Sequence, residues 1–252
     1  MRKIIAFLLM ALPGLVLAVE AGYPLDPAPI NLEDKTSLQR GARLFVNYCM
    51  GCHSVQYQRY NRLARDVGLT DELVLQNLVF TGAKVGDTMQ NAMSKTIGDD
   101  GKPAARRWFG AQPPDLSLIA RSRGVDYLYT YLRTFYVDEK RPLGVNNAVF
   151  PMVGMPHALW ELQGLQKPIY EKHKDAEGNE TEVIVGFQQV VPGKLNATEY
   201  NAAVADLVNF LAYVAEPIKL ERQRIGVWVL AFLALCIVVF YLLKEEYWKD
   251  VH

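Results

Sequence analysis

The chain has 252 residues, of which 50% are hydrophobic, 21% are charged and 11% are aromatic. Its 27 basic and 27 acidic side chains leave a formal net charge of zero, which argues against a nucleic-acid binder because that class normally carries a basic excess. The ordinary charged fraction argues against wholesale disorder, and three cysteines are too few for a scaffold stapled by disulfides.

The N-terminal segment is predicted to be a secretory signal peptide. Arg2 and Lys3 precede an apolar run, Ile4–Ala18, that ends in a small-x-small pattern, and these are the features of a cleaved export signal. A membrane span is the alternative, but the run is short and contains a proline and a glycine. We expect cleavage after Ala18, with Ala21 as second choice, so that the mature chain works outside the cytoplasm.

A helix is predicted over residues 38–48. Leu38, Ala42 and Phe45 recur at helical spacing, and Asp34 and Thr36 are candidate N-caps ahead of them. We expect this helix to pack across the last helix of the soluble part of the chain. Gly41 is well placed to let the two helices approach closely.

Cys49-Met50-Gly51-Cys52-His53 follows this helix and has the C-x-x-C-H pattern of covalent c-type heme attachment. Two thiols two residues apart reach both vinyl groups on one porphyrin edge, and the adjoining histidine then lies under the iron as its proximal ligand. A C-x-x-C redox pair does not require that histidine. A zinc site needs about four ligands, and His157, His173 and His252 form no second ligand pair. A plain structural disulfide is the remaining alternative.

Residues 84–112 and 142–156 are rich in Gly, Pro and Asn and are predicted to be long irregular loops. Long loops in a compact domain are usually functional or wrapped around something. Between them, residues 125–136 predict a helix rich in aromatic side chains.

The second loop holds the leading candidate for the second iron ligand. Outside the signal peptide and the attachment loop, the methionines are Met89, Met93, Met152 and Met155. Met155 leads because nearby prolines fix the backbone and the preceding glycine permits close approach to a flat ring. Met152 and His157 stay as alternatives, and core packing is the ordinary role of any one methionine. Methionine–histidine ligation favours high-potential electron transfer, whereas an open position favours ligand binding.

Three further elements complete the chain. Residues 167–194 are polar and then alternate, which predicts a hairpin or an excursion from the core. An apolar stripe over residues 204–214 predicts a helix, residues 198–214, closed by Pro217. The 19 residues 225–243 carry no charge and, at about 1.5 Å each, nearly span the ~30 Å hydrocarbon core of a bilayer. With the export signal, this span predicts a cytoplasmic tail.

In this order of parts the sequence closely resembles the cytochrome c1 family, the heme subunit of the ubiquinol–cytochrome c reductase (cytochrome bc1 complex, complex III). The resemblance rests on the attachment motif, the segment from Pro113 to Arg121 (PPDLSLIAR), the loop 147–156 with its continuation WELQG at 160–164, and Ala215-Glu216-Pro217 ahead of the C-terminal span. It covers essentially the whole mature chain.

The resemblance implies roles for individual residues. Cys49 and Cys52 would hold one covalent heme c, with His53 and Met155 as iron ligands. Arg121 would pair with a heme propionate, a bidentate contact that suits a buried carboxylate. Tyr127 would lie near the heme, and Pro113 and Pro114 would line its pocket.

It also implies an architecture and partners. We expect a mostly α class I cytochrome c-like heme domain with long loop insertions and one C-terminal transmembrane helix. The expected boundaries are a signal peptide at 1–18, a periplasmic domain at 19–221, an anchor in the bacterial inner membrane at 222–244 and a cytoplasmic tail at 245–252. The expected partners are cytochrome b, the Rieske iron–sulfur protein that gives the electron, a soluble or membrane-bound cytochrome c that takes it, and membrane lipid.

Two other functions compete with this reading. The first is a membrane-anchored c-type cytochrome of another respiratory chain or of an oxidase. The second, from a different class, is a heme-based ligand-binding sensor, which would keep one iron position open.

Overall fold

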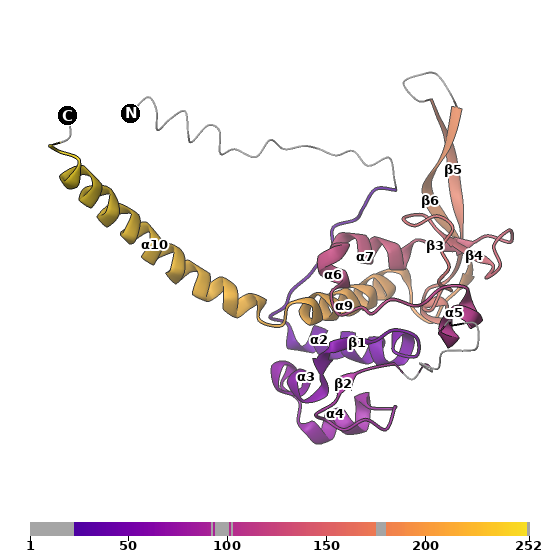
Figure 1. Cartoon of the computed structure of the whole chain (residues 1–252). Coiled ribbons are helices and arrows are strands. Elements are labelled where there is room, and N and C mark those ends of the chain that lie inside the picture. The colour runs from indigo at the N-terminus through magenta and orange to yellow at the C-terminus, as the bar shows by residue number, and fades with distance from the viewer. Residues whose placement is uncertain (1–22, 92, 94–100, 102, 175–179, 251–252) are drawn as a thin grey trace.

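The computed structural model describes residues 23–91, 93, 101, 103–174 and 180–250. The predicted signal peptide and its two candidate cleavage sites lie outside the described residues. Figure 1 shows a helical body, a long hairpin projecting from one end of it, and a single long helix leaving the body.

Most of the regular structure is helical, as predicted. The first half of the chain forms α2 (Lys35–Leu44), the π-helical turn η1 (Phe45–Cys49), β1 (Val55–Arg59), α3 (Tyr60–Val67), α4 (Asp71–Leu78), β2 (Thr88–Met89), α5 (Ala104–Phe109), α6 (Ile119–Ser122) and α7 (Val125–Arg133). The second half forms β3 (Phe135–Val137), β4 (Val145–Asn147), α8 (Trp160–Gln163), β5 (Gly164–Lys174), β6 (Glu180–Pro192), α9 (Ala197–Ala215) and α10 (Lys219–Tyr247). The strands pair antiparallel as β1–β2, β3–β4 and β5–β6.

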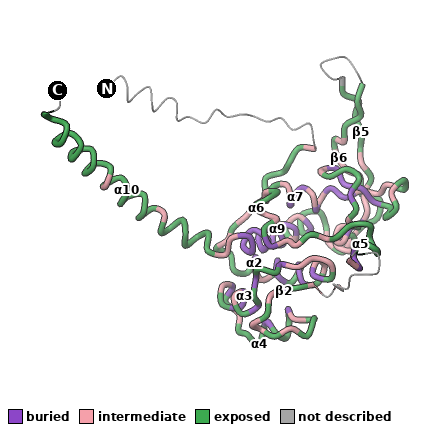
Figure 2. The backbone as a smooth tube through the Cα atoms, in the orientation of Figure 1, coloured by how far each residue is buried: buried purple, intermediate pink, exposed green. Residues whose placement is uncertain are grey.

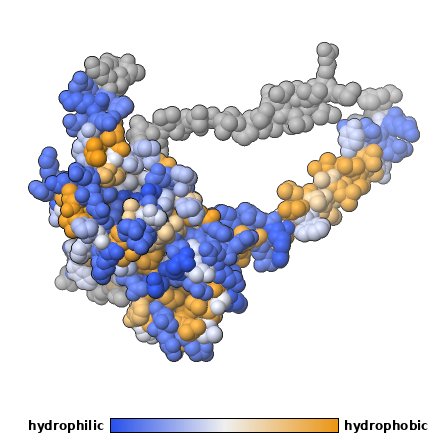
Figure 3. Space-filling view, turned by 180° about the vertical axis from the view of Figure 1, so that it is seen from behind, coloured by the Kyte–Doolittle hydropathy of each residue, from blue (hydrophilic) through white to orange (hydrophobic). Residues whose placement is uncertain are grey.

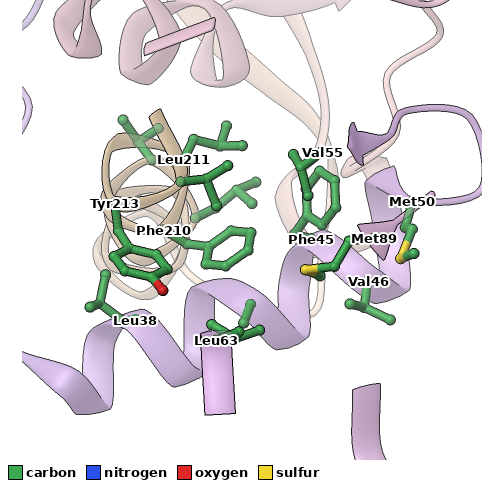
Figure 4. Packing of buried hydrophobic residues seen from close by; sticks show 14 of the residues in the cluster. Leu38, Phe45, Val46, Met50, Val55, Leu63, Met89, Phe210, Leu211 and Tyr213 are labelled. Atoms are coloured by element: carbon green, nitrogen blue, oxygen red, sulfur yellow. The ribbon is translucent and has the colours of Figure 1, made fainter. Parts of the chain in front are cut away.

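The main core lies where α2 and α9 cross. Leu38, Ala42 and Phe45 of the predicted stripe are all buried, and the ring of Phe45 packs on that of Phe210 from α9, with centroids 5.5 Å apart. Figure 4 shows this pair between side chains from α3, β1 and β2. Asp34 caps α2 through its side chain, as predicted. The sequence therefore identified this helix pair from its apolar spacing.

Gly41 makes the α2–α9 crossing possible. A Cβ atom at this position would lie 2.7 Å from Cβ of Phe210 and 2.8 Å from the carbonyl carbon of Asp206, and closer still to the carbonyl oxygen of Asp206. Only a residue without a side chain fits there, so the predicted role of Gly41 is confirmed. At the neighbouring position, the guanidinium of Arg40 donates two hydrogen bonds to the carboxylate of Asp206, at 2.5 and 2.8 Å. This ion pair links the two helices.

The helix predicted over residues 125–136 is shorter in the structure, because α7 ends at Arg133. The hydroxyl of Thr134 donates to the carbonyl of Thr130 at 2.9 Å and satisfies an acceptor in the last turn. Phe135 then pairs with Asn147 in the β3–β4 ladder and is buried. The aromatic run is thus divided between a helix and a strand, because Phe135 contributes to a second core.

This second cluster consists of Phe135, Val145 and Val153, with Tyr131 and Met155 packed against it. The loops predicted over 84–112 and 142–156 are consequently not wholly irregular. The first contains β2 and α5 among its described residues, and the second contains β4. Short strands in these loops give their backbone donors and acceptors a partner.

The segment predicted as a hairpin forms β5 and β6. The ladder runs from Gly164 opposite Pro192 to Lys174 opposite Glu180. Figure 2 shows the outer part of this hairpin exposed on all sides, whereas its base lies against the body. At the base, Phe187 packs near Tyr136 and Tyr23, with ring centroids 6.3 and 6.0 Å away. The hairpin is therefore anchored to the body at its base.

The helix α10 carries the apolar span predicted over residues 225–243. It extends beyond that span at both ends, and its apolar window has a mean hydropathy of 2.8 with none of its residues buried. Figure 3 shows the apolar band between two hydrophilic ends. Among the described helices, α10 is the one long and apolar enough to cross a membrane.

Candidate heme-binding site

The attachment motif lies on a tight turn that continues directly from α2. The turn η1 ends at Cys49, and the amide of Met50 donates to the carbonyl of Phe45 at 2.9 Å. The amides of Cys52 and His53 both donate to the carbonyl of Cys49, at 3.1 and 2.9 Å. A π-type turn is a frequent feature of functional sites, and this one gathers the two thiols and the imidazole on one small loop.

Met50 points away from this site. Its side chain is buried in the main core, and the hydroxyl of Tyr60 donates to its sulfur at 3.6 Å. The prediction that Met50 does not serve as the second ligand agrees with this placement. Figure 4 shows it among the side chains beside β2.

His53 is oriented by the backbone of Pro114. Its Nδ1 lies 2.7 Å from the carbonyl oxygen of Pro114, and since a carbonyl can only accept, Nδ1 carries the proton. The tautomer so fixed leaves Nε2 as the ring nitrogen with a free lone pair, which is how ligating histidines are commonly arranged. Burial lowers the pKa of His53, opposed by the Pro114 carbonyl and the charge of Asp115. The ring is therefore held in the neutral form that binds a metal.

The segment after Pro114 is docked on the strand that follows the attachment turn. The amide of Leu116 donates to the carbonyl of Ser54 at 2.8 Å, and the Asp115 carboxylate accepts from the amide of Gln56 at 3.1 Å. Two parts of the chain that the sequence singled out independently, the attachment motif and the PPDLS segment, are thus one unit. Pro113 is half-buried and Pro114 is exposed beside it.

Asn91 also holds this turn, and the sequence did not single it out. Its side-chain amide donates to the carbonyl of Cys52 at 2.6 Å, and its backbone amide donates to the hydroxyl of Ser54 at 2.9 Å. An asparagine in a long polar loop carries no local signal of such a contact, because the contact is made across 39 residues.

The cysteines of the attachment motif are free thiols. Cys49, Cys52 and Cys236 are all unpaired, and no group of three His, Cys, Asp or Glu side chains suited to a metal ion occurs in the described part of the chain. Burial and the neighbouring Cys52 raise the pKa of Cys49 to about 12, so this thiol is neutral at pH 7. Two free thiols on the same turn as a neutral imidazole fit the donor chemistry of a covalently attached heme.

Met155, the predicted second ligand, lies against the second cluster. The hydroxyl of Tyr131 donates to its sulfur at 3.4 Å. The alternatives are placed differently: Met89 is fully buried in the main core, and Met152 is 70% exposed. Met152 also has a φ of +61°, the one positive φ among the described non-glycine residues. Of these three methionines, Met155 is the one at the edge of a core rather than inside it or in solvent.

His157 is buried in the same region. Its ring stacks on Phe135 with centroids 5.0 Å apart, and its Nε2 has no partner. Burial lowers its pKa to about 4. The ring is therefore neutral, and His157 stays the predicted alternative to Met155 as the second iron ligand.

Arg121 and Tyr127 occupy different surroundings. Arg121 is exposed, and its charge helps to lower the pKa of Glu216, after the larger effect of Arg222. Tyr127 is half-buried and stacks on Tyr131, with centroids 5.9 Å apart and planes 11° from parallel. The arginine over the Tyr127 ring is Arg123, whose guanidinium carbon lies 5.5 Å from the centroid. The sequence did not single out Arg123, which is the C-cap residue of α6.

The attachment turn and the aromatic residues of α7 border the same core. Cys49, Tyr127 and Tyr131 all pack against the main cluster. A C-x-x-C-H turn with a neutral, carbonyl-oriented histidine, in a chain that also presents a thioether beside its core, defines a c-type cytochrome.

Comparisons with known proteins place the chain within that class. The model of the Cytochrome C1 family matches residues 28–164 and 193–251, and the chain belongs to this family. It therefore carries covalent heme c and is the electron-transfer heme subunit of a bc1 complex, a respiratory reductase in which the chain itself is an electron carrier. Members of the family are anchored in the membrane, and α10 is the candidate anchor.

Two relatives match over the full chain. Cytochrome c1 of Allochromatium vinosum is 51% identical, with 100% of both chains covered. A protein of Nitrosomonas europaea named "Ammonia monooxygenase gamma subunit" is 43% identical, with 99% of this chain and 100% of the other covered. A solved structure titled "Hyperthermophilic respiratory Complex III" covers 100% of this chain at 18% identity, with a TM-score of 0.44.

Proposed function

We propose that this subunit accepts one electron at a time from a Rieske iron–sulfur protein and passes it to a soluble or membrane-bound c-type cytochrome. The observation that carries the proposal is the hydrogen bond between His53 Nδ1 and the Pro114 carbonyl at 2.7 Å, because it leaves Nε2 available to bind the heme iron. Cytochrome b is the proposed membrane partner. The soluble part would be a class I cytochrome c-like domain with long insertions.

Cys49 and Cys52 would hold the heme through thioether bonds, and His53 and Met155 would be the iron ligands. When bound, the heme iron supplies the one-electron Fe(III)/Fe(II) couple, and methionine with histidine keeps its potential high. The chain's own contribution is to hold both ligands through either oxidation state. The turn after η1 fixes His53, and the second cluster fixes the loop that carries Met155. A site that does not rearrange is suited to fast electron transfer.

Arg121, Tyr127, Pro113 and Pro114 are proposed to surround the heme, with Arg121 on a propionate. The neighbouring Arg123 offers a matched comparison because it lies over Tyr127 and has the same charge. Arg121→Gln is expected to lower the heme midpoint potential, since it removes a positive charge beside a carboxylate, and Arg123→Gln to have the smaller effect. Redox titration of both variants measures this, and a larger shift in Arg123→Gln would reassign the propionate contact.

The proposed topology is a signal peptide at 1–18, a periplasmic heme domain at 19–221, an anchor at 222–244 and a cytoplasmic tail at 245–252. The exposed apolar helix α10 supports the anchor. A protease added to intact spheroplasts should digest the heme domain and leave an epitope tag placed after residue 252 intact. Loss of the tag from intact spheroplasts would reverse the orientation.

The ligand assignment is tested by the far-red charge-transfer band of ferric heme bound through methionine sulfur. Met155→Leu should abolish this band and leave the heme covalently attached, whereas Met152→Leu and Met89→Leu should retain it. Survival of the band in Met155→Leu would assign the ligand to another methionine. A chain that lacks the band before any substitution, and readily binds carbon monoxide, would favour a ligand-binding sensor.

The assignment of partners is tested by the subunits that purify with a tagged chain from detergent-solubilised membranes. We expect a cytochrome b and a Rieske protein. A solitary cytochrome would favour an independent anchored carrier. Monooxygenase subunits in their place would support the function suggested by the name of the Nitrosomonas relative.

A further inference from the structure

The hydroxyl of Tyr131 is directed at the sulfur of Met155. The oxygen–sulfur distance is 3.4 Å, with the hydroxyl as donor. A thioether sulfur is a weak hydrogen-bond acceptor and cannot donate, so the proton of this contact belongs to the tyrosine. The contact lies at the edge of the second cluster, where both side chains are partly buried.

The ring of Tyr131 has little freedom to turn away. Tyr127 stacks on it with planes 11° from parallel, and Phe135 meets it edge-on at a centroid distance of 5.1 Å and an angle of 74°. Aromatic pairs of this kind are each worth about 0.5–1.5 kcal/mol beyond the area that they bury. The direction of the hydroxyl is therefore set by packing on two sides.

The loop that carries Met155 is fixed to the same helix end by a buried amide. The side chain of Asn147 donates to the Tyr131 carbonyl at 2.7 Å. Its oxygen accepts from the amides of Val149 and Phe150, at 3.0 and 3.1 Å. One side chain thus sets the distance between the tyrosine and the methionine loop.

We propose that Tyr131 is a positioning residue that raises the potential of the heme through Met155. This inference rests on the proposed function, in which Met155 is an axial ligand. A thioether sulfur has two lone pairs, so it can accept from Tyr131 with one while the other is available to a metal. A proton donor on sulfur withdraws electron density from it. The sulfur then donates less strongly to iron, which disfavours Fe(III) relative to Fe(II).

The test is Tyr131→Phe in the full-length chain within its purified complex, because this variant keeps the ring and removes only the hydroxyl. A net hydrogen bond is worth roughly 1 kcal/mol, and a sulfur acceptor makes a weaker one. We expect the Fe(II)/Fe(III) ratio at fixed ambient potential to fall about threefold, which is about 30 mV in midpoint potential at 59 mV per tenfold for one electron. The far-red band should shift or weaken, and Tyr131→Leu should move both readouts in the same direction.

Tyr129→Phe is the matched control. Tyr129 is a buried tyrosine on the same helix, but its ring lies under the guanidinium of Arg133, 4.4 Å from the centroid. It should leave the potential and the band unchanged. The inference is overturned if Tyr131→Phe matches Tyr129→Phe in both readouts, or if its potential rises. If Met155→Leu still loses the band in that case, the axial assignment stands and only the role of Tyr131 fails.

Discussion

Gly41→Ala tests the crossing on which the heme-bearing end of the domain depends. The new Cβ would lie 2.7 Å from Cβ of Phe210, whereas carbon atoms prefer about 3.5–4.0 Å. The neighbouring Asp206 atoms belong to the backbone of α9, so no side-chain rotation removes the collision. The two helices would have to separate by about 1 Å.

The cost follows from what the separation disturbs. Overpacking a well-packed site typically costs about 1–3 kcal/mol, and loosening the Phe45–Phe210 ring pair adds about 0.5–1.5 kcal/mol. The better helix propensity of alanine offsets about 1 kcal/mol of this cost. Together these ranges lower the free energy of unfolding by about 0.5–3.5 kcal/mol, and we expect a fall of about 2 kcal/mol. With a urea m-value of about 2 kcal/mol per molar, the midpoint should then fall by about 1 M.

The assay is urea unfolding of the detergent-solubilised, heme-loaded chain, followed by the Soret absorbance. Gly86→Ala is the control, because a Cβ at that position meets nothing within 4 Å and its φ is not positive. It should change the free energy of unfolding by less than about 0.5 kcal/mol. A Gly41→Ala midpoint equal to that of Gly86→Ala would refute the close approach of α2 and α9.

Three further outcomes are expected. Asn147→Ala should lower the unfolding free energy by about 2–4 kcal/mol in the same urea assay, because two loop amides lose their acceptor; an unchanged midpoint would show that water replaces it. Gly164→Ala should destabilise by more than about 2 kcal/mol, since Gly164 has a φ of +86° and its Cβ would collide with the backbone of β6, whereas Gly186→Ala should be near neutral. Shortening the hairpin so that Glu171 joins Val183, its ladder partner, through Asn-Gly should retain covalent heme, measured by heme stain after denaturing electrophoresis; loss of heme would show that the outer hairpin is needed for maturation.

The sequence predicted the features that depend on residues close together in the chain. The attachment motif, the stripe around Phe45, the Asp34 cap and the apolar span each depend on residues within a few turns of one another. Gly41 was also predicted, because two apolar stripes that must meet need a small residue at their crossing. The alternation over residues 182–187 was enough to predict a hairpin.

Other features depend on contacts that no local pattern encodes. Asn91 and Asn147 are polar residues in loops, and their value comes from backbone groups brought to them by folding. Tyr131 is one of several aromatic residues in the segment 125–136, and the sequence does not show which of them contacts the methionine loop. Only the fold directs its hydroxyl to Met155. Phe135 was assigned to the preceding helix because aromatic spacing does not show where a buried strand begins.

One part of the chain lies outside the match to the family model. The family model passes over residues 165–192, which are nearly the whole of β5 and β6. The full-length match to the Allochromatium vinosum protein includes this stretch. The hairpin therefore lies in a stretch that aligns with that relative and that the family model leaves unmatched. Its base is integrated with the body, since Gln166 donates to the carbonyls of Arg133 and Phe135 at 3.0 and 2.8 Å.

The short junction between α9 and α10 ties the heme domain closely to the membrane helix. Only residues 216–218 separate the two helices, and three residues span at most about 10 Å. Pro217 stiffens them further, and Glu216 is bound to Arg222 in the first turns of α10. With α10 held in a bilayer, this junction keeps the adjoining end of the heme domain close to the membrane surface. A donor tethered to the same membrane would then meet the domain at a high effective concentration.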